Sequence, residues 1–447
     1  MDQKSDWDTA RLVAVDKKHV RHPFTAMADW CAPEHEPLVL VEGRGALLWD
    51  SAGREYIDGN PSIWTNVHGH NNPRINAAIR SQLDLVENPS FLGSTNPTAI
   101  RLAEAIVQVI PNQRLTRCFY SDDDSTGVEV ALRIAAQYWR LRGSKRGQFL
   151  AFRGGYHGDT VWAAALGAKH LFGSPLGEWR YPTRQIATIE ALEQLPLDIV
   201  DDVIAVVIEP LVQGAAGIRI WPAGTLAAVR NWCDHSGVLM IADEVLTGFG
   251  RTGTMFACEQ ESVTPDLMVL GKRLRGGYLP LALTLLTEEV FAPFLADSDI
   301  ARTLFYGHSY IGNALGCAAA LASLEVFHEE QVLEQLQGKI AQLAAELDPL
   351  KLLDGVVEIR QCGFIAGIEG RQTEDARSSG AQSRFTGAAL CEAARRHGLL
   401  TRAIKNVVVL MLPFCTTEAQ LHRAVEAIRL AILEVYSQPA PAAQQLR

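Results

Sequence analysis

Two short apolar runs in the middle of the chain end on residues with chemical uses. Residues 238–242 (VLMIA) lead into Asp243-Glu244, and residues 266–270 (DLMVL) lead into Gly271-Lys272. Unbroken apolar runs of this length are typical of strands that are buried on both faces, as in a parallel sheet. Because ligand sites in such sheets lie at the carboxyl ends of the strands, we expect Asp243 and Lys272 at the same edge of one sheet.

Strand and helix patterns alternate over roughly residues 100–290. Strands are expected at 115–120, 149–152 and 203–208, and helices at 98–109, 126–142 and 224–236. The helix over 126–142 would begin with the capping-box spacing of Thr126 and Glu129. This order predicts an α/β fold with a mainly parallel central sheet and helices on both of its faces.

The two chain ends follow a different pattern. Short strands are expected at 38–42, 46–49, 54–57, 356–360, 364–369 and 407–412, with helices at 333–347, 385–397 and 417–436. These elements predict a second, smaller sheet with helices beside it. Residues 438–447 contain two prolines and three alanines, and we expect them to form a disordered tail.

Length and charge narrow the class of protein. A chain of 447 residues favours two domains, and a net charge of −10 argues against nucleic acid or an anionic membrane surface as the main partner. The eight cysteines include no C-x-x-C pair, so we expect free thiols in a reducing compartment. The first residues lack the apolar core of a signal peptide, and no apolar run is long enough to span a bilayer. We therefore expect a cytoplasmic protein without a membrane segment, and no metal site is predicted.

A lysine and a carboxylate at one sheet edge suit pyridoxal 5'-phosphate (PLP). The cofactor needs a lysine for its Schiff base and an acidic group at its pyridine nitrogen, which makes Lys272 and Asp243 the candidates. The alternative is a pair of ordinary charged residues at the sheet edge. Gly248–Gly253 matches the dinucleotide pattern G-x-G-x-x-G, but it neither follows a strand directly nor opens a clear helix, so we do not expect a nicotinamide site.

Several motifs together resemble the class III (omega) aminotransferases of PLP fold type I, over about residues 20–435. They are His22-Pro23-Phe24-Thr25, Asp58-Gly59, Gly154-Gly155-Tyr156-His157-Gly158-Asp159-Thr160, Asp243-Glu244-Val245, Gly248-Phe249-Gly250-Arg251-Thr252-Gly253, Gly271-Lys272, Gly276-Gly277-Tyr278-Leu279-Pro280 and Gly307-His308-Ser309-Tyr310-Ile311-Gly312-Asn313. The resemblance implies a large PLP-binding domain of residues 61–330. It also implies a small domain built from both chain ends, residues 1–60 and 331–437.

The resemblance implies roles around the cofactor ring. Lys272 would hold PLP and then move a proton between substrate and cofactor carbons. Asp243 would pair with the pyridinium nitrogen, with Val245 on one face of the ring and Tyr156 on the other. Without the resemblance, Tyr156 is equally well an ordinary loop tyrosine.

Further roles concern the phosphate and the substrate. Ser125 would hold the phosphate at a helix start, and Ser309 would offer its hydroxyl to the phosphate of a partner subunit. Arg402 would bind the carboxylate of the keto substrate. The remaining substrate contacts are expected from Phe24, Trp64, Tyr156 and Gly307. By spacing alone, Ser125 is equally a helix cap and Arg402 equally a surface arginine.

Three positions depart from the family pattern. Asp124 stands before Ser125 where the family usually has glycine, which places a carboxylate beside the cofactor phosphate. Two unit charges about 4 Å apart interact by about 1–4 kcal/mol in water-like to surface-like surroundings. Arg275 replaces a threonine, so the acidic and basic departures would compensate each other if they touched. A family tryptophan pair is Ile63-Trp64 here.

Within the family, the motifs most resemble the branch that works in biotin synthesis. That branch converts 8-amino-7-oxononanoate to 7,8-diaminononanoate, with S-adenosylmethionine or lysine as amino donor, in a homodimer whose active sites lie at the subunit interface. Residues 276–280 and 307–310, with Phe24, are similar to its lysine-using members. Two alternatives remain: another class III aminotransferase with a different amine substrate, or a non-catalytic relative with weakened PLP binding.

Overall fold

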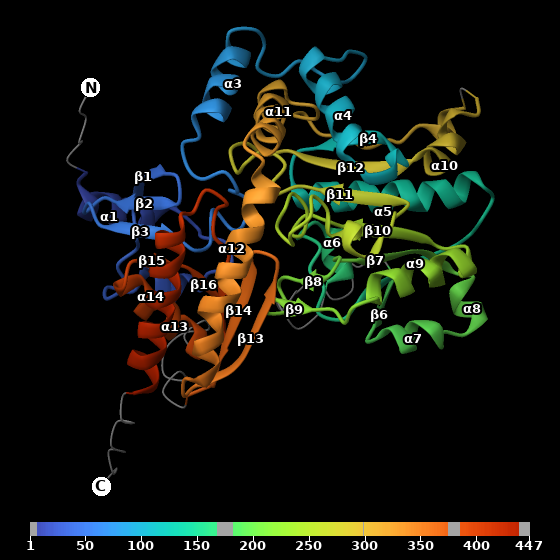
Figure 1. Ribbon diagram of the computed structural model, residues 1–447. Coiled ribbons are helices and arrows are strands. Elements are labelled where there is room, and N and C mark those ends of the chain that lie inside the picture. Colours follow the sequence, from blue (N-terminus) through green and yellow to red (C-terminus); the bar gives the residue numbers. More distant parts are fainter. Residues whose placement is uncertain (1–6, 168–181, 298, 374–384, 438–447) are drawn as a thin grey trace.

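A seven-stranded sheet lies in the right-hand part of the computed structural model as drawn in Figure 1. The structure describes residues 7–167, 182–297, 299–373 and 385–437, so the predicted tail at 438–447 lies outside the described residues. The strand order is β4-β12-β11-β10-β7-β5-β6. These strands are β4 (Leu115–Ser121), β5 (Gln148–Phe152), β6 (Thr183–Ile186), β7 (Val203–Ile208), β10 (Leu239–Asp243), β11 (Leu267–Leu270) and β12 (Ala282–Thr287). Only β12 runs antiparallel to its neighbours, which confirms the α/β fold with a mainly parallel sheet.

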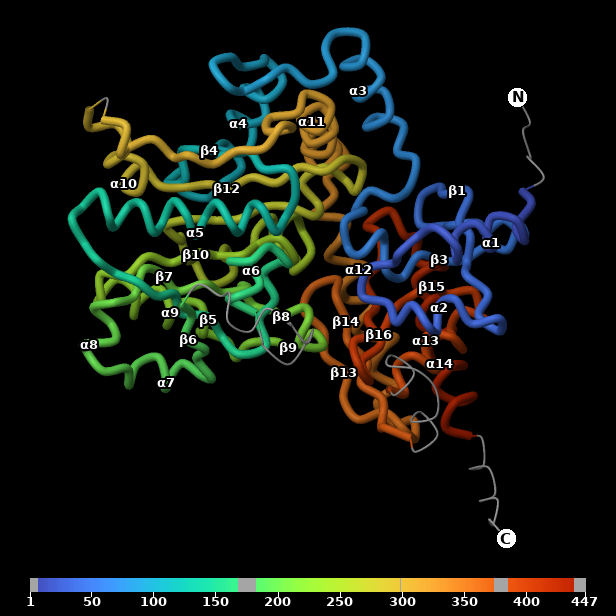
Figure 2. Tube along the Cα trace, turned by 180° about the vertical axis from the view of Figure 1, so that it is seen from behind, coloured from blue at the N-terminus to red at the C-terminus, as the bar shows by residue number. Residues whose placement is uncertain are grey.

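Helices cover both faces of this sheet because its strands are apolar on both sides. In β10, Met240 and Ala242 face a core shared with α4 (Pro97–Val109) and α9 (Thr225–Ser236). The alternate residues Leu239 and Ile241 face α5 (Asp124–Leu141) and α6 (Val161–Leu166). Figure 2 shows α5 lying along the sheet, in line with its strands. Alternation of side chains along a strand thus gives each helix layer an apolar partner.

Helix α5 begins two residues earlier than the sequence predicted. Its N-cap is Asp123, whose side chain accepts the N–H of Thr126 while the Thr126 hydroxyl accepts the N–H of Asp123. The predicted pairing of Thr126 with Glu129 is therefore wrong. Glu129 instead accepts the Thr160 hydroxyl at 2.7 Å and holds the start of α6. As a result, Asp124 and Ser125 are the first residues of the helix.

Segments from the two chain ends share a second region, drawn in blue and in orange to red in Figure 1. One sheet has the order β1-β2-β3-β15 and another β13-β14-β17-β16. Their strands are β1 (Leu40–Arg44), β2 (Leu47–Asp50), β3 (Glu55–Asp58), β13 (Val356–Cys362), β14 (Ile365–Gly370), β15 (Leu399–Leu400), β16 (Arg402–Ile404) and β17 (Val407–Leu410). Because β15 pairs with β3, residues about 340 positions apart share one sheet. The domain boundaries at residues 60 and 330 stay predictions.

The other elements connect or cover these sheets. They are α1 (Thr9–His19), α2 (Met27–Cys31), α3 (Pro73–Leu83), α7 (Ile189–Glu193), α8 (Leu197–Val200), α10 (Glu288–Phe291), α11 (Ala314–Glu329), α12 (Val332–Leu347), α13 (Thr386–Arg396), α14 (Glu418–Tyr436), β8 (Val212–Gln213) and β9 (Arg219–Ile220). Among the helices of the described ranges, none has the length and apolar character needed to cross a membrane.

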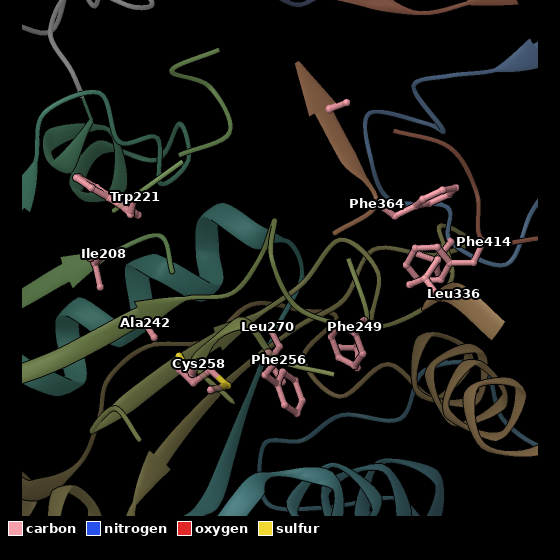
Figure 3. Close-up of a cluster of buried hydrophobic side chains, with 14 of the residues drawn as sticks. Ile208, Trp221, Ala242, Phe249, Phe256, Cys258, Leu270, Leu336, Phe364 and Phe414 are labelled. Carbon is pink, nitrogen blue, oxygen red and sulfur yellow. The ribbon is translucent and has the colours of Figure 1, made fainter. Parts of the chain in front are cut away.

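The core continues from the central sheet into the chain ends. Figure 3 shows Phe249 and Phe256 near Leu270 at the end of β11, and Phe364 and Phe414 beyond them. Arg251, fully buried, donates from Nη1 to the backbone oxygens of Phe364 and Leu412 at 3.0 and 2.8 Å. The glycine-rich segment 248–253 therefore joins the two parts of the chain. It is followed by a 3₁₀ turn at Ala257–Glu261, not by the helix of a dinucleotide site.

Candidate active site

Chemically useful residues follow five strands at one edge of the central sheet: the four neighbours β11, β10, β7 and β5, and β4, which the antiparallel β12 separates from them. Asp243 is the last residue of β10, Glu209 follows β7 directly, and Lys272 comes two residues after β11. Tyr156 follows β5, and Ser125 follows β4. These strands run in the same direction, so their carboxyl ends gather the side chains of residues far apart in the sequence.

One cavity of about 1460 Å³ lies at this edge. The predicted site residues that line it are Phe24, Trp64, Asp124, Ser125, Tyr156, Asp243, Val245, Lys272 and Arg402. Gly307 and Ser309 do not line it and are exposed, in the segment that precedes α11. A single chain therefore brings the cofactor and substrate candidates together, apart from Gly307 and from Ser309, which was expected to act across a subunit interface.

Asp243 is buried and held by two donors. Its Oδ2 lies 2.7 Å from Nδ1 of His157, and its Oδ1 accepts the N–H of Val245 at 3.2 Å. Burial works to lower the pKa of His157, but the hydrogen bond and charge of Asp243 outweigh it and raise that pKa. Val245 is buried too and lines the cavity beside Asp243. The carboxylate is thus fixed in orientation at the floor of the cavity.

Lys272 lies in the same cavity with its amine 5.5 Å from the centre of the Trp64 ring. Burial lowers the pKa of Lys272, and the neighbouring Arg273 lowers it further, while the carboxylate of Asp124 acts in the opposite direction. A lysine with a lowered pKa spends more time as the neutral amine, which is the form that attacks a carbonyl or accepts a proton.

Ser125 lies in the first turn of α5, where backbone N–H groups have no partner within the helix. Its Oγ accepts the N–H of Asp159 at 3.1 Å. Gly158 makes this contact possible, because a Cβ at that position would lie 2.6 Å from Ser125 Oγ. The hydroxyl and the positive end of the helix dipole make this corner of the cavity suitable for an anion.

The indole ring of Trp64 lies near two cations, Lys272 and Arg402. The guanidinium of Arg402, in β16, lies 5.9 Å from the centre of the same indole ring. Ser62, Ile63 and Trp64 have φ values of 48°, 55° and 70°. These positive φ values lie in the left-handed region of backbone conformation, which residues other than glycine rarely adopt. Three such residues in a row carry backbone strain, which proteins retain mainly where function requires it. The departure Ile63-Trp64 thus forms a turn that buries the tryptophan and leaves Ile63 exposed.

The sequence interpretation assigned no role to two buried residues of the site. His157 holds Asp243 across 86 positions of sequence. Glu209 accepts the N–H groups of Tyr156 and Gly214, both at 3.1 Å, and burial raises its pKa to about 7. Glu209 has a sequence signal, since it follows an apolar run as Asp243 does. His157 belongs to the motif at residues 154–160, but only the fold shows that its partner is Asp243.

A lysine with a lowered pKa, a fixed buried carboxylate and an anion-binding helix start around one cavity are what a PLP enzyme requires. The family model "Aminotransferase class-III" matches residues 30–432, and the chain belongs to this family, whose members bind PLP. It is 44% identical to an adenosylmethionine-8-amino-7-oxononanoate aminotransferase from Nitratidesulfovibrio vulgaris, over 96% of this chain and 82% of that protein.

Solved structures agree with this assignment. An adenosylmethionine-8-amino-7-oxononanoate aminotransferase from Methanocaldococcus jannaschii superposes with a TM-score of 0.91 at 36% identity, covering 96% of this chain and 99% of that one. A PLP-bound amine transaminase from an uncultivated Pseudomonas species gives 0.87 at 30% identity, covering 93% and 98%. The chain is therefore a PLP-dependent aminotransferase of class III with fold type I.

Proposed function

We propose that this aminotransferase converts 8-amino-7-oxononanoate to 7,8-diaminononanoate in biotin synthesis. The observation that carries the proposal is the position of Arg402 in the same cavity as Lys272, with both cations within about 6 Å of the Trp64 ring. A keto acid with a remote carboxylate needs a cation separate from the reacting lysine, and a guanidinium suits a carboxylate. The names of the similar proteins from N. vulgaris and M. jannaschii support the same substrate.

The residues present fit the cofactor. When bound, PLP carries the amino group between the two substrates and accepts electron density from the reacting carbon. Asp243, held by His157, would face the pyridine nitrogen. Ser125 and the first N–H groups of α5 would hold the phosphate. Val245 and Tyr156 would pack on the two faces of the ring, since both line the cavity.

Lys272 would perform the proton transfer. Burial favours its neutral amine, which can accept a proton from the substrate carbon and return it. Tyr156 has its hydroxyl fixed by a 2.6 Å hydrogen bond to Asp159 and its N–H fixed by Glu209. The tyrosine would therefore limit ring movement while the lysine moves the proton.

For the amino donor, we propose S-adenosylmethionine, with lysine as the alternative. The names of the similar proteins support the first, and the stretches at 276–280 and 307–310 support the second. Both donors are cationic. Glu34, Glu36 and Glu392 are exposed at the lining of the cavity, which also includes Arg395 and Lys405, so the charge of the lining does not distinguish between the two donors.

A homodimer would complete the site. Gly307 and Ser309 lie outside the cavity of their own chain and are exposed. Nδ2 of Asn88 donates to the backbone oxygen of Ser309 at 3.4 Å, so the segments around the two residues lie together. Leu92 and Phe305, on these segments, are 94% and 72% exposed. Exposed apolar side chains of this size beside a site residue favour burial against a second copy of the chain.

The proposal is tested with the PLP-loaded protein and its visible absorption band. S-adenosylmethionine and lysine are added singly, and then 8-amino-7-oxononanoate is added while 7,8-diaminononanoate is measured by mass spectrometry. We expect one donor to bleach the band, the keto acid to restore it and the diamine to accumulate. Lys272→Ala should abolish all three signals.

Other outcomes would replace the proposal. Bleaching by other amines only, without diamine formation, would assign the protein to class III aminotransferases of different substrate, like the amine transaminase it resembles. A folded protein that develops no band with excess PLP would be a non-catalytic relative.

A further inference from the structure

Asp124 and Arg275, the acidic and basic departures from the family pattern, contact each other. Oδ1 of Asp124 lies 3.4 Å from Nη1 of Arg275. The same oxygen accepts the backbone N–H of Lys272 at 2.9 Å. Nη1 of Arg275 also donates to the backbone oxygen of Leu281 at 2.6 Å. One carboxylate therefore links the start of α5 to the segment that carries the reactive lysine.

This contact depends on the glycine before the lysine. A Cβ on Gly271 would lie 2.1 Å from Oδ1 of Asp124, so any side chain there would displace the carboxylate. Asp124 also lines the cavity next to Ser125, whereas Arg275 is buried behind it and is not part of the lining. The carboxylate of Asp124 thus faces the cavity at the start of α5. The guanidinium of Arg275 contacts this carboxylate from the protein interior.

We propose that Asp124 and Arg275 act as one electrically neutral unit of the phosphate subsite. Arg275 compensates the carboxylate so that a phosphate dianion can bind beside it, and Asp124 positions the backbone of Lys272. The inference rests on the proposed function for the location of the phosphate at Ser125. It makes Asp124 and Arg275 positioning residues, because neither reacts.

The proposal predicts opposite effects for the two partners. Without Arg275, the carboxylate repels the incoming phosphate. Like charges about 4 Å apart in surface-like surroundings repel strongly enough to weaken binding by about tenfold or more. Without the charge of Asp124, the remaining guanidinium attracts the phosphate. Asp124→Asn keeps an oxygen that can accept the Lys272 N–H, so it removes the charge with little change in that contact.

The experiment compares PLP with pyridoxal, which lacks the phosphate. Dissociation constants of both are measured on the cofactor-free full-length protein for the wild type, R275T, D124N and D124G/R275T. For R275T we expect PLP to bind about tenfold or more weakly and pyridoxal within about twofold of wild type. For D124N we expect PLP to bind as tightly as to wild type or more tightly. The double variant should return PLP affinity to within about threefold of wild type.

A matched control is the ion pair of Arg230 with Asp266, at 2.8 Å on the opposite edge of the sheet. R230T should lower the melting temperature without changing the ratio of PLP to pyridoxal affinity. Melting temperatures of all cofactor-free variants identify any that fail to fold. Equal losses of both ligands in R275T, or weaker PLP binding in D124N than in R275T, would overturn the inference. A wild type that binds no PLP would instead overturn the proposed function.

Discussion

His157 and Asp243 form a buried pair at the floor of the cavity, with 2.7 Å between Nδ1 and Oδ2. The raised pKa of His157 favours its protonated form, which donates to the carboxylate. Burial raises the pKa of Glu209 to about 7. The charges of this pair also act on that pKa, since His157 lowers it and Asp243 raises it. Asp243, whose carboxylate would face the cofactor, is thus held in place by His157, which takes no part in the expected reaction.

Removing this support should slow the reaction. His157→Ala should lower kcat by about 10–100-fold, because a hydrogen bond to a charged group contributes about 1.5–3 kcal/mol. His157→Asn places an amide N–H near the position of Nδ1 and should recover most of the loss. Steady-state kinetics with PLP at saturation measure both. Equal kcat values for the alanine variant and the wild type would refute a role for His157 in holding Asp243.

Arg402 should act on the substrate carboxylate and not on the chemistry. Arg402→Ala should raise KM for 8-amino-7-oxononanoate by about 10–100-fold, the cost of one charged hydrogen bond. The same variant should have an unchanged KM for a ketone substrate that lacks a carboxylate. Arg396→Ala serves as the control, because Arg396 is exposed and pairs with Glu434 outside the cavity. The same loss with both ketones would show that Arg402 only supports the shape of the cavity.

The strands that carry the site were predictable because their signal is local. Val203–Ile208 and the runs before Asp243 and Lys272 are apolar without interruption, and only a doubly covered sheet buries such residues completely. The local apolar pattern was therefore enough to predict that Asp243 and Lys272 lie at the same edge of the central sheet. The antiparallel direction of β12 depends on the path of the chain after Lys272, which the composition of the strand does not encode.

The rest of the site depends on contacts between distant residues. The start of α5 was misplaced because Asp123, Thr126 and Glu129 all have capping-box spacing, and Glu129 is taken by the tertiary contact with Thr160. The contact of Asp124 with Arg275 spans 151 positions. Sequence suggested compensation between these charges, but only the fold determines that they meet.

The proposed dimer predicts a specific weak point. Leu92→Glu should shift the protein from dimer to monomer in size-exclusion chromatography with light scattering, because it would bury a charge against a partner. It should also weaken PLP retention, since Ser309 of the partner subunit would be lost from the site. Leu352→Glu is the control, as Leu352 is 89% exposed at the end of the 3₁₀ helix Asp348–Leu352. Identical elution of both variants and the wild type would contradict this location of the interface.

A buried histidine away from the cavity predicts how stability depends on pH. Nε2 of His68 lies 2.9 Å from Oγ of Ser323 in α11, and burial lowers the pKa of His68 to about 3. The unfolded chain takes up a proton near pH 6.5 and the folded chain does not. Stability is therefore lost as pH falls from about 6.5 towards 3, by up to about 1.4 kcal/mol per pH unit.

Urea unfolding at fixed protein concentration measures this effect. Between pH 6.5 and 5, the wild type should lose about 1.6 kcal/mol more free energy of unfolding than His68→Gln, whose amide can still reach Ser323 without titrating. His235→Gln, at an exposed position of α9, should keep the pH dependence of the wild type. If His68→Gln lost stability with falling pH as steeply as the wild type, the histidine would have to be protonated in the folded protein, and its buried contact with Ser323 could not set the acid sensitivity.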